Sequence, residues 1–153
     1  SFIDDPSRII RGLKFSVRFG FKLDDLTQKL QEEYLSNINY DVSYHRLKKE
    51  LVETFSLNKQ KAFDLFLEQG IYKLLGENQQ IPDIRISIED LVNENPCKHI
   101  WMVYLGLFDL SKFELTRQEK RIIEWAERLR KEKPTNNTPL ESILLNKLYF
   151  SAI

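Results

Sequence analysis

Residues 1–21, SFIDDPSRIIRGLKFSVRFGF, form the most informative stretch of the chain. Asp5 followed by Pro6 predicts a helix start, because Asp caps exposed amides and Pro is tolerated at the first helical position. The helix is expected to cover about residues 6–19. Positions 5 and 8 then lie one turn apart, so that Asp5 and Arg8 can face the same point in space.

The opening helix separates basic from apolar residues. At about 100° per residue, the basic residues spread over roughly a third of the circumference: Arg8, Arg11, Lys14 and Arg18. The apolar residues gather on the other side: Ile9, Ile10, Leu13 and Val17. Phe15 and Phe19 fall toward the basic stripe, beside its guanidinium groups. From the pattern alone, this stripe is either a solvated helix face or the lining of a pocket for an anionic ligand.

An acid beside a guanidinium can read the edge of a nucleobase. A carboxylate accepts from the exocyclic amine of adenine or cytosine, and Arg donates to the neighbouring ring acceptors. Uracil and guanine place a carbonyl where that amine stands, and it would meet the carboxylate lone pair to lone pair. Asp5 and Arg8 therefore predict a preference for ATP and CTP over UTP and GTP. The simpler interpretation of Asp5 is N-capping, and its two oxygens allow both roles.

Three ordered segments resemble one enzyme family. Residues 1–21 look like the start of the neck domain in the tRNA nucleotidyltransferase/poly(A) polymerase family, the bacterial-type (class II) CCA-adding and A-adding enzymes, where a DDPxRxxRxxRF-like segment leads the first neck helix. Residues 42–51, VSYHRLKKEL, are similar to the family's VSxxRIxxEL helix, and residues 62–71, AFDLFLEQGI, to its AFxLLxELGLL helix. The resemblance covers roughly residues 1–76 and implies a neck domain there, followed by a helical body or tail region over residues 77–153.

The resemblance implies nucleotide-binding roles for four residues of the opening helix: Asp5, Arg8, Arg11 and Lys14. The first two would recognise ATP or CTP, and the other two would contact the triphosphate or orient Asp5. Arg46 and Glu50, four residues apart, are expected to support the pocket, although a plain surface ion pair explains them nearly as well. The chain departs from the family pattern at Asp4, where Glu is frequent, and at Lys14, where Arg is usual. Lys keeps the charge but lacks the planar fork.

The activity implied by the resemblance is two-metal phosphoryl transfer from Mg²⁺-bound ATP or CTP to the 3′-hydroxyl of tRNA. The Gly-rich turn and paired aspartates of the family's catalytic head have no counterpart in this sequence. The chain is therefore expected to be a C-terminal fragment that contains no catalytic residue, lacks activity alone and works with its own N-terminal head, which would hold the Mg²⁺. The alternatives are a poly(A) polymerase acting on other RNA and a non-catalytic helical protein-interaction module.

Composition limits the remaining possibilities. The formal net charge is zero, which is not typical of a general nucleic-acid binder, so RNA contacts would have to come from local patches. The single Cys97 cannot form an internal disulfide and fits a reducing, cytoplasmic location. No apolar run approaches the length of a membrane span, and no signal peptide is recognisable. His45 and His99 are isolated and do not indicate a metal site.

Hydrophobic periodicity predicts an all-α fold, an irregular multi-helix array. Gly20 is expected to end the opening helix. Further helices are expected at about residues 24–36, 43–55, 58–70, 71–75, 87–93, 97–110, 116–131 and from 139 onward. Leu26, Leu30 and Leu35 are assigned to the apolar side of the second helix.

Three further details concern the later helices. Residues 97–110 are expected to be the most buried helix. Thr116 and Glu119 form a capping-box pattern that opens the next one. Basic residues of 117–133 alternate with glutamates, which favours a solvated face, with contact to a tRNA backbone as the alternative.

Overall fold

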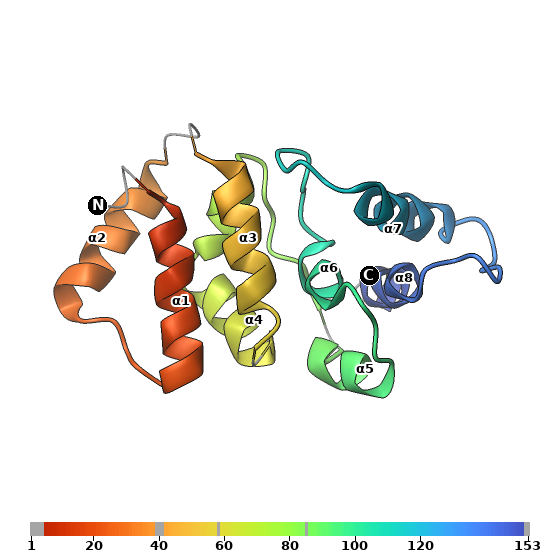
Figure 1. Ribbon diagram of the computed structural model, residues 1–153, viewed down its shortest axis with the longest axis horizontal. Helices are drawn as coiled ribbons and strands as arrows, with labels where there is room; N and C mark the ends of the chain where they lie inside the picture. The colour runs from red at the N-terminus through yellow and green to blue at the C-terminus, as the bar shows by residue number, and fades with distance from the viewer. Residues whose placement is uncertain (1–4, 39–41, 58, 85, 152–153) are drawn as a thin grey trace. The chain divides into compact units, whose positions relative to one another are not determined.

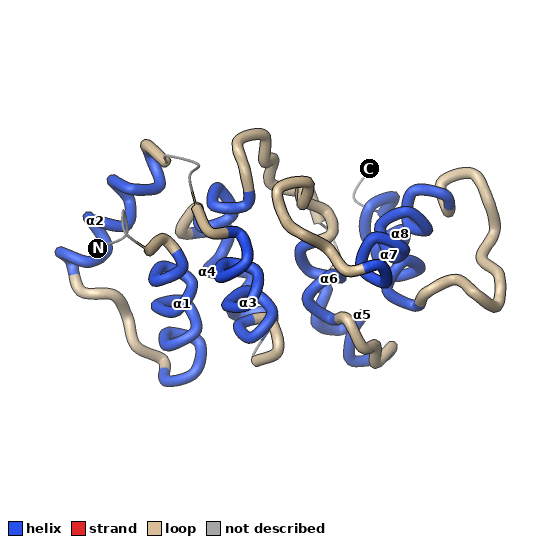
Figure 2. Tube along the Cα trace, turned by 45° about the horizontal axis from the view of Figure 1, so that its top comes forward, coloured by secondary structure: helices blue, strands red, loops and turns tan. Residues whose placement is uncertain are grey.

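The computed structural model describes residues 5–38, 42–57, 59–84 and 86–151. All regular secondary structure in these ranges is helical, which confirms the all-α prediction and the irregular multi-helix array (Figures 1 and 2). Within the same ranges, no helix combines the length and the hydropathy needed to span a membrane.

The chain divides into two compact units, and the first includes a segment that returns from later in the sequence. One unit comprises Ser1–Gln79 with Asp109–Phe113, and the other comprises Gln80–Phe108 with Glu114–Ile153. Two reciprocal hydrogen bonds hold the returning segment. The side-chain Nε2 of Gln79 donates to the Asp109 carbonyl at 2.7 Å, and the backbone amide of Asp109 donates to Gln79 Oε1 at 2.9 Å. The sequence predicted a division after residue 76 and did not predict this return.

The first unit contains four α-helices and a 3-10 helix: α1 (Ser7–Phe19), α2 (Asp25–Ser36), α3 (Tyr44–Thr54), α4 (Lys59–Glu68) and η1 (Ile71–Leu75). Helix α1 lies beside α3 and also contacts α4 (Figures 1 and 2). Its apolar residues are buried as predicted: Ile9, Ile10, Leu13 and Val17. Burial of this stripe is the main attachment of α1, since its other face is charged.

Local sequence signals set the ends of α1. The helix begins at Ser7, one residue later than expected, with Pro6 rather than Asp5 at the N-cap position and no side-chain cap bond. The Arg8 amide donates to the carbonyl of Asp5 at 3.1 Å. It ends at Gly20, which has the left-handed backbone expected of a C-terminal glycine (φ 71°). The Gly20 amide donates to the Ser16 carbonyl at 2.9 Å, satisfying one of the last carbonyls of the helix.

Helix α2 differs from its predicted orientation. Leu26 and Leu30 are 68% and 48% exposed, and of the three leucines assigned to the inner side only Leu35 is buried. Gln31, one turn before Leu35, is buried instead and donates to Gln69 Oε1 at 2.9 Å. Because this bond satisfies the buried amide, the face that carries residues 31 and 35 can turn inward. Leu26 and Leu30 then point outward.

Helix α3 provides much of the core of the first unit. Ser43 caps this helix, since its hydroxyl accepts from the Arg46 amide. Leu47, Leu51 and Phe55 are buried. The ring of Phe55 meets two rings of α4 edge to face, with centroids at 5.6 and 6.4 Å for Phe66 and Phe63. Asn58, expected to open the fourth helix, lies outside the described residues.

The second unit contains α5 (Ile88–Glu94), α6 (Ile100–Leu105), α7 (Arg117–Arg128) and α8 (Leu140–Ser151). Helix α6 is shorter than the predicted 97–110, but residues 101–105 are all buried, as expected. The capping box is confirmed: the Thr116 amide donates to Glu119 Oε1 at 2.8 Å, and the Glu119 amide donates to Thr116 Oγ1 at 3.2 Å. Cys97 is half-buried.

Two glycines of α1 give a matched test of backbone strain. Gly20→Ala is expected to lower the free energy of unfolding by about 1 kcal/mol, because a residue with a Cβ is strained in left-handed backbone. No atom lies within 4 Å of the added Cβ, so the cost comes from the backbone alone. Gly12→Ala should instead raise it by about 0.5–1 kcal/mol, since alanine favours the helix. The nearest atom there, Leu23 Cδ2, lies at an ordinary 3.9 Å. Urea unfolding of both variants measures the signs, and effects of the same sign would contradict this account.

Candidate functional site

Five charged residues join the polar face of α1 to α3. Arg11 donates to Asp5 Oδ2 at 3.0 Å and to Glu50 Oε1 at 3.3 Å. The ammonium of Lys14 lies 3.2 Å from Glu50 Oε2 and 2.9 Å from Glu53 Oε2. Glu50 therefore bridges two cations of the neighbouring helix. We call these five residues the α1–α3 charge network.

Asp5 is fixed at the N-terminal end of this network. Its Oδ1 accepts from both the amide and the hydroxyl of Ser7, and the Ser7 hydroxyl also accepts from Arg11 at 3.2 Å. These bonds occupy one lone pair or more on each carboxylate oxygen, and a carboxylate offers about four. Asp5, with a side chain 16% exposed, can still accept a hydrogen bond from a ligand.

The surroundings keep Asp5 ionised. The Ser7 hydroxyl is the main cause of a lowered pKa at this carboxyl, and the positive charge of Arg11 adds to it, while burial opposes both. The pKa of Lys14 is raised by its hydrogen bonds to Glu53 and Glu50. Both ends of the network are therefore charged throughout the neutral pH range.

Arg8 lies apart from this network. Its side chain is exposed, and within the described part of the chain it makes no hydrogen bond or ion pair, including none with Asp5. Asp5 contacts Arg11 instead, although the sequence placed Arg8 beside it. Helical side chains point back toward the N-terminus, which lets the long side chain of Arg11 pass Ser7 and reach Asp5.

The ion pair expected between Arg46 and Glu50 is not present in the described part of the chain. Arg11 and Lys14 contact the two oxygens of Glu50 instead. Arg46 is exposed, and its charge makes only a minor contribution to the lowered pKa of Asp5. Glu50 thus connects the two helices, whereas Arg46 acts at a distance.

Sequence reasoning missed Ser7 and Glu53. A Ser two residues after an Asp at a helix start is a frequent local hydrogen-bonding arrangement, and it was a usable signal for Ser7. Glu53 follows Glu50 by three residues, as Lys14 follows Arg11. Two acids and two bases at the same spacing on two helices indicate faces that can pair, once the helices are known to be neighbours.

A row of exposed aromatic rings continues from the basic face of α1. Phe15, Phe19 and Phe21 are 55%, 53% and 64% exposed, and successive ring centroids lie 5.6 and 5.7 Å apart. The guanidinium of Arg18 lies 5.5 Å from the Phe19 centroid, close to the arrangement that the helical spacing predicts.

The first unit also has a hollow of about 610 Å³ among residues of α1, α2 and α4, within the size range of small-molecule sites. Its lining mixes both charges, including Lys22, Lys61, Glu32 and Glu68. None of the predicted site residues lines it. Among the residues that the structure describes, no three His, Cys, Asp or Glu side chains form a group that could hold a metal ion.

Comparison with known proteins gives no relative: the chain matches no protein-family model, no curated protein and no solved structure.

Asp5 predicts a pH-dependent contribution to stability. Because its pKa is lowered from the ordinary 3.8, its contribution is fully present above that value and is lost as the pH falls through the folded-state pKa. Asp5→Asn should therefore lower the free energy of unfolding by about 1 kcal/mol at neutral pH, because the charged hydrogen bonds with Ser7 and Arg11 are lost, and by progressively less in acid.

Urea unfolding at a series of pH values measures this difference between the native chain and the variant. Asp64→Asn is the control, since Asp64 is an exposed carboxylate that accepts from Gln60 within α4. Its effect should stay within about 0.5 kcal/mol. A deficit in Asp5→Asn that persists unchanged in acid would refute the role of the charge.

Proposed function

We propose that the chain is the nucleotide-reading and RNA-supporting helical part of a template-independent nucleotidyltransferase that adds CMP and AMP, or AMP alone, to a tRNA 3′ end. The resemblance of residues 1–21, 42–51 and 62–71 to the neck of that family supports this function. It also implies a catalytic head outside these residues, Mg²⁺-bound ATP or CTP as substrates and a cytoplasmic location. In such an enzyme Mg²⁺ stabilises the charge that develops on the transferred phosphate.

The observation that carries the proposal is a carboxylate held ionised one turn before an exposed guanidinium. Asp5 is fixed by Ser7 and Arg11, and Arg8 has no partner among the described residues. The amine of adenine or cytosine would donate to a remaining lone pair of Asp5. Arg8 would donate to the ring nitrogen beside that amine.

The remaining residues of the site have positioning roles in this proposal. Arg11 orients Asp5, which was one of its two expected roles. Lys14 is held by Glu50 and Glu53, which supports a role in fixing α1 against α3 over direct contact with a triphosphate. Glu50 supports the site by bridging both cations. Arg46 adds positive potential near Asp5.

Two other functions remain open. A poly(A) polymerase acting on other RNA would use the same reading helix. A helical protein-interaction module is favoured by the exposed rings of Phe15, Phe19 and Phe21, because exposed aromatic clusters frequently mark interfaces.

Substitution of Asp5 or Arg8 tests the proposal in the full-length enzyme, in which this chain is joined to its catalytic head. Asp5→Asn and Arg8→Gln should each reduce the preference for ATP and CTP over UTP and GTP by at least about tenfold. The introduced asparagine amide can donate to a carbonyl that a carboxylate rejects, and the introduced glutamine lacks the charged donor to the ring acceptor of adenine or cytosine. Incorporation of each nucleotide into a tRNA lacking its CCA end measures the preference.

Arg18→Gln is the matched control, because it removes one positive charge from the same helix without touching Asp5. It should leave the nucleotide preference unchanged. An unchanged preference in Asp5→Asn and Arg8→Gln, with circular dichroism showing an intact fold, would favour the docking alternative.

The chain alone should release no pyrophosphate from ATP in the presence of Mg²⁺ and tRNA, because the proposed catalytic carboxylates lie in the head. Incorporation of labelled ATP into tRNA measures this directly. Robust incorporation by the isolated chain would contradict the division of labour between head and neck.

A further inference from the structure

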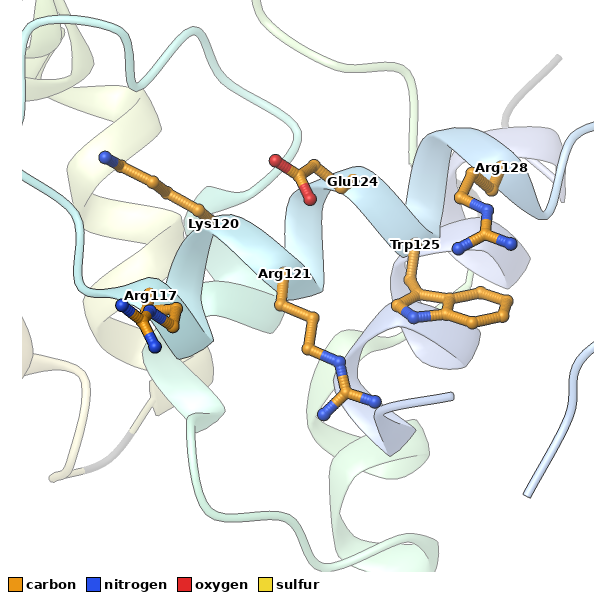
Figure 3. A pocket seen from close by; sticks show the side chains of 6 residues that line it. All are labelled: Arg117, Lys120, Arg121, Glu124, Trp125 and Arg128. Carbon is orange, nitrogen blue, oxygen red and sulfur yellow. The ribbon is translucent and has the colours of Figure 1, made fainter. Parts of the chain in front are cut away.

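A basic pocket lies on the outer surface of α7 (Figure 3). It has a volume of about 540 Å³ and is lined by six residues of this helix: Arg117, Lys120, Arg121, Glu124, Trp125 and Arg128. They form two adjacent rows at four-residue spacing, one at positions 117, 121 and 125 and the other at positions 120, 124 and 128. The pocket is the groove between these rows.

The charges of this pocket are not balanced within it. Its lining carries four cations and one carboxylate, Glu124. Arg117, Lys120 and Arg121 lie near the N-terminal end of α7, where the helix dipole already favours negative charge. Of the acids outside the lining, Glu119 is buried and accepts from the Thr116 amide in the capping box, and Glu132 pairs with Arg128 at the C-terminal end of the helix. Helix stability therefore does not explain this cluster, whereas binding of an anion does.

The cations of the pocket differ in how they are held. Arg121 donates to the Asn137 carbonyl, which fixes its guanidinium. The Arg128 guanidinium lies 4.0 Å from the centre of the Trp125 ring and 3.0 Å from Glu132. Arg117 and Lys120 are exposed and form no hydrogen bond or ion pair with any residue that the structure describes. Two cations are thus positioned, and two are available to a ligand.

We infer that this pocket binds consecutive phosphate groups of an RNA strand. Guanidinium groups bind phosphate oxygens with two parallel hydrogen bonds. Arg117 and Arg121 are separated by about 6 Å along the helix axis, which suits neighbouring phosphates of an extended strand. Arg128 covers the ring of Trp125, so this ring is not open for a base to stack on it. Contact with the RNA backbone does not need such stacking, because it requires no base readout.

The lining favours nucleic acid over a protein partner. Protein interfaces have an apolar core, but the one apolar side chain of this pocket, Trp125, is only 8% exposed. Interfaces with nucleic acid are more polar and more positively charged. The choice of RNA among polyanions rests on the proposed function. The site itself uses none of the residues of the α1–α3 charge network.

The test is fluorescence anisotropy of a short labelled single-stranded RNA with the full chain, at a series of salt concentrations. The variant Arg117→Gln/Lys120→Gln removes the two available cations, and both side chains are exposed, so the fold should persist. We expect its affinity at low salt to fall about tenfold. The slope of log affinity against log salt should become shallower by about 1.4, since each lost phosphate contact on a single strand contributes about 0.7.

Lys131→Gln/Lys133→Gln is the matched control, because it makes the same charge change at exposed positions just beyond α7. Its salt slope should stay close to that of the native chain. Equal losses in both double variants would overturn the site, because they would show a diffuse response to net charge. Lack of RNA binding at low salt would overturn it as well, and so would equally effective competition by polyglutamate, which would indicate an acidic protein partner.

The failures of the two proposals are distinguishable. RNA binding is measured without nucleotides and depends on α7, whereas nucleotide preference depends on Asp5 and Arg8 of α1. A chain that binds RNA through Arg117 and Lys120, in an enzyme whose nucleotide preference ignores Asp5, would keep this inference and remove the proposed function. A chain whose RNA binding ignores Arg117 and Lys120, in an enzyme whose nucleotide preference depends on Asp5, would remove this inference and keep the proposed function.

Discussion

The carboxylate of Glu50 between Arg11 and Lys14 is the interaction on which the rest of the candidate site depends. It ties the polar face of α1 to α3, while the apolar stripe of α1 is buried on its other side. The Glu50 side chain is 15% exposed, so its charge is screened less than that of a surface pair. Loss of this carboxylate would leave two cations without their shared partner and would release Arg11, which holds Asp5.

This arrangement separates the guanidinium that holds Asp5, that of Arg11, from the exposed guanidinium of Arg8. A direct bond between Asp5 and Arg8 would neutralise both groups, and a nucleobase would have to break that bond before it could be read. Arg11 takes the place beside Asp5, and Ser7 holds the other carboxylate oxygen. The acid therefore stays ionised and oriented, while Arg8 keeps its donors exposed. The contact expected between Asp5 and Arg8 is absent among the described residues, and base reading by this pair stays a prediction.

Features of the fold that depend on neighbouring residues in the sequence were predictable. The left-handed Gly20 and the Ser43 cap are determined within one helical turn, so the pattern alone predicts them. The outward orientation of Leu26 depends on a distant glutamine, and the partners of Glu50 come from a helix 36 and 39 residues away. For such contacts several partners are plausible from spacing, and Arg46 was the basic residue one turn before Glu50 in the same helix. Only the packing of α1 against α3 decides between them.

The two basic surfaces of the chain show why the number of cations is a poor guide to polyanion binding. On α1, Arg11 and Lys14 are matched by carboxylates at hydrogen-bonding distance, and the local field there is largely compensated. On α7, the pocket lining has one carboxylate against four cations. Arg128 pairs with Glu132, whereas Arg117 and Lys120, in the first turns of the helix, pair with no described residue. A chain of zero net charge can therefore carry a strong positive potential where its acids are committed elsewhere. A helix face whose cations are paired with nearby carboxylates is held against its neighbour by these pairs. A face whose cations lack such partners can bind a phosphate backbone.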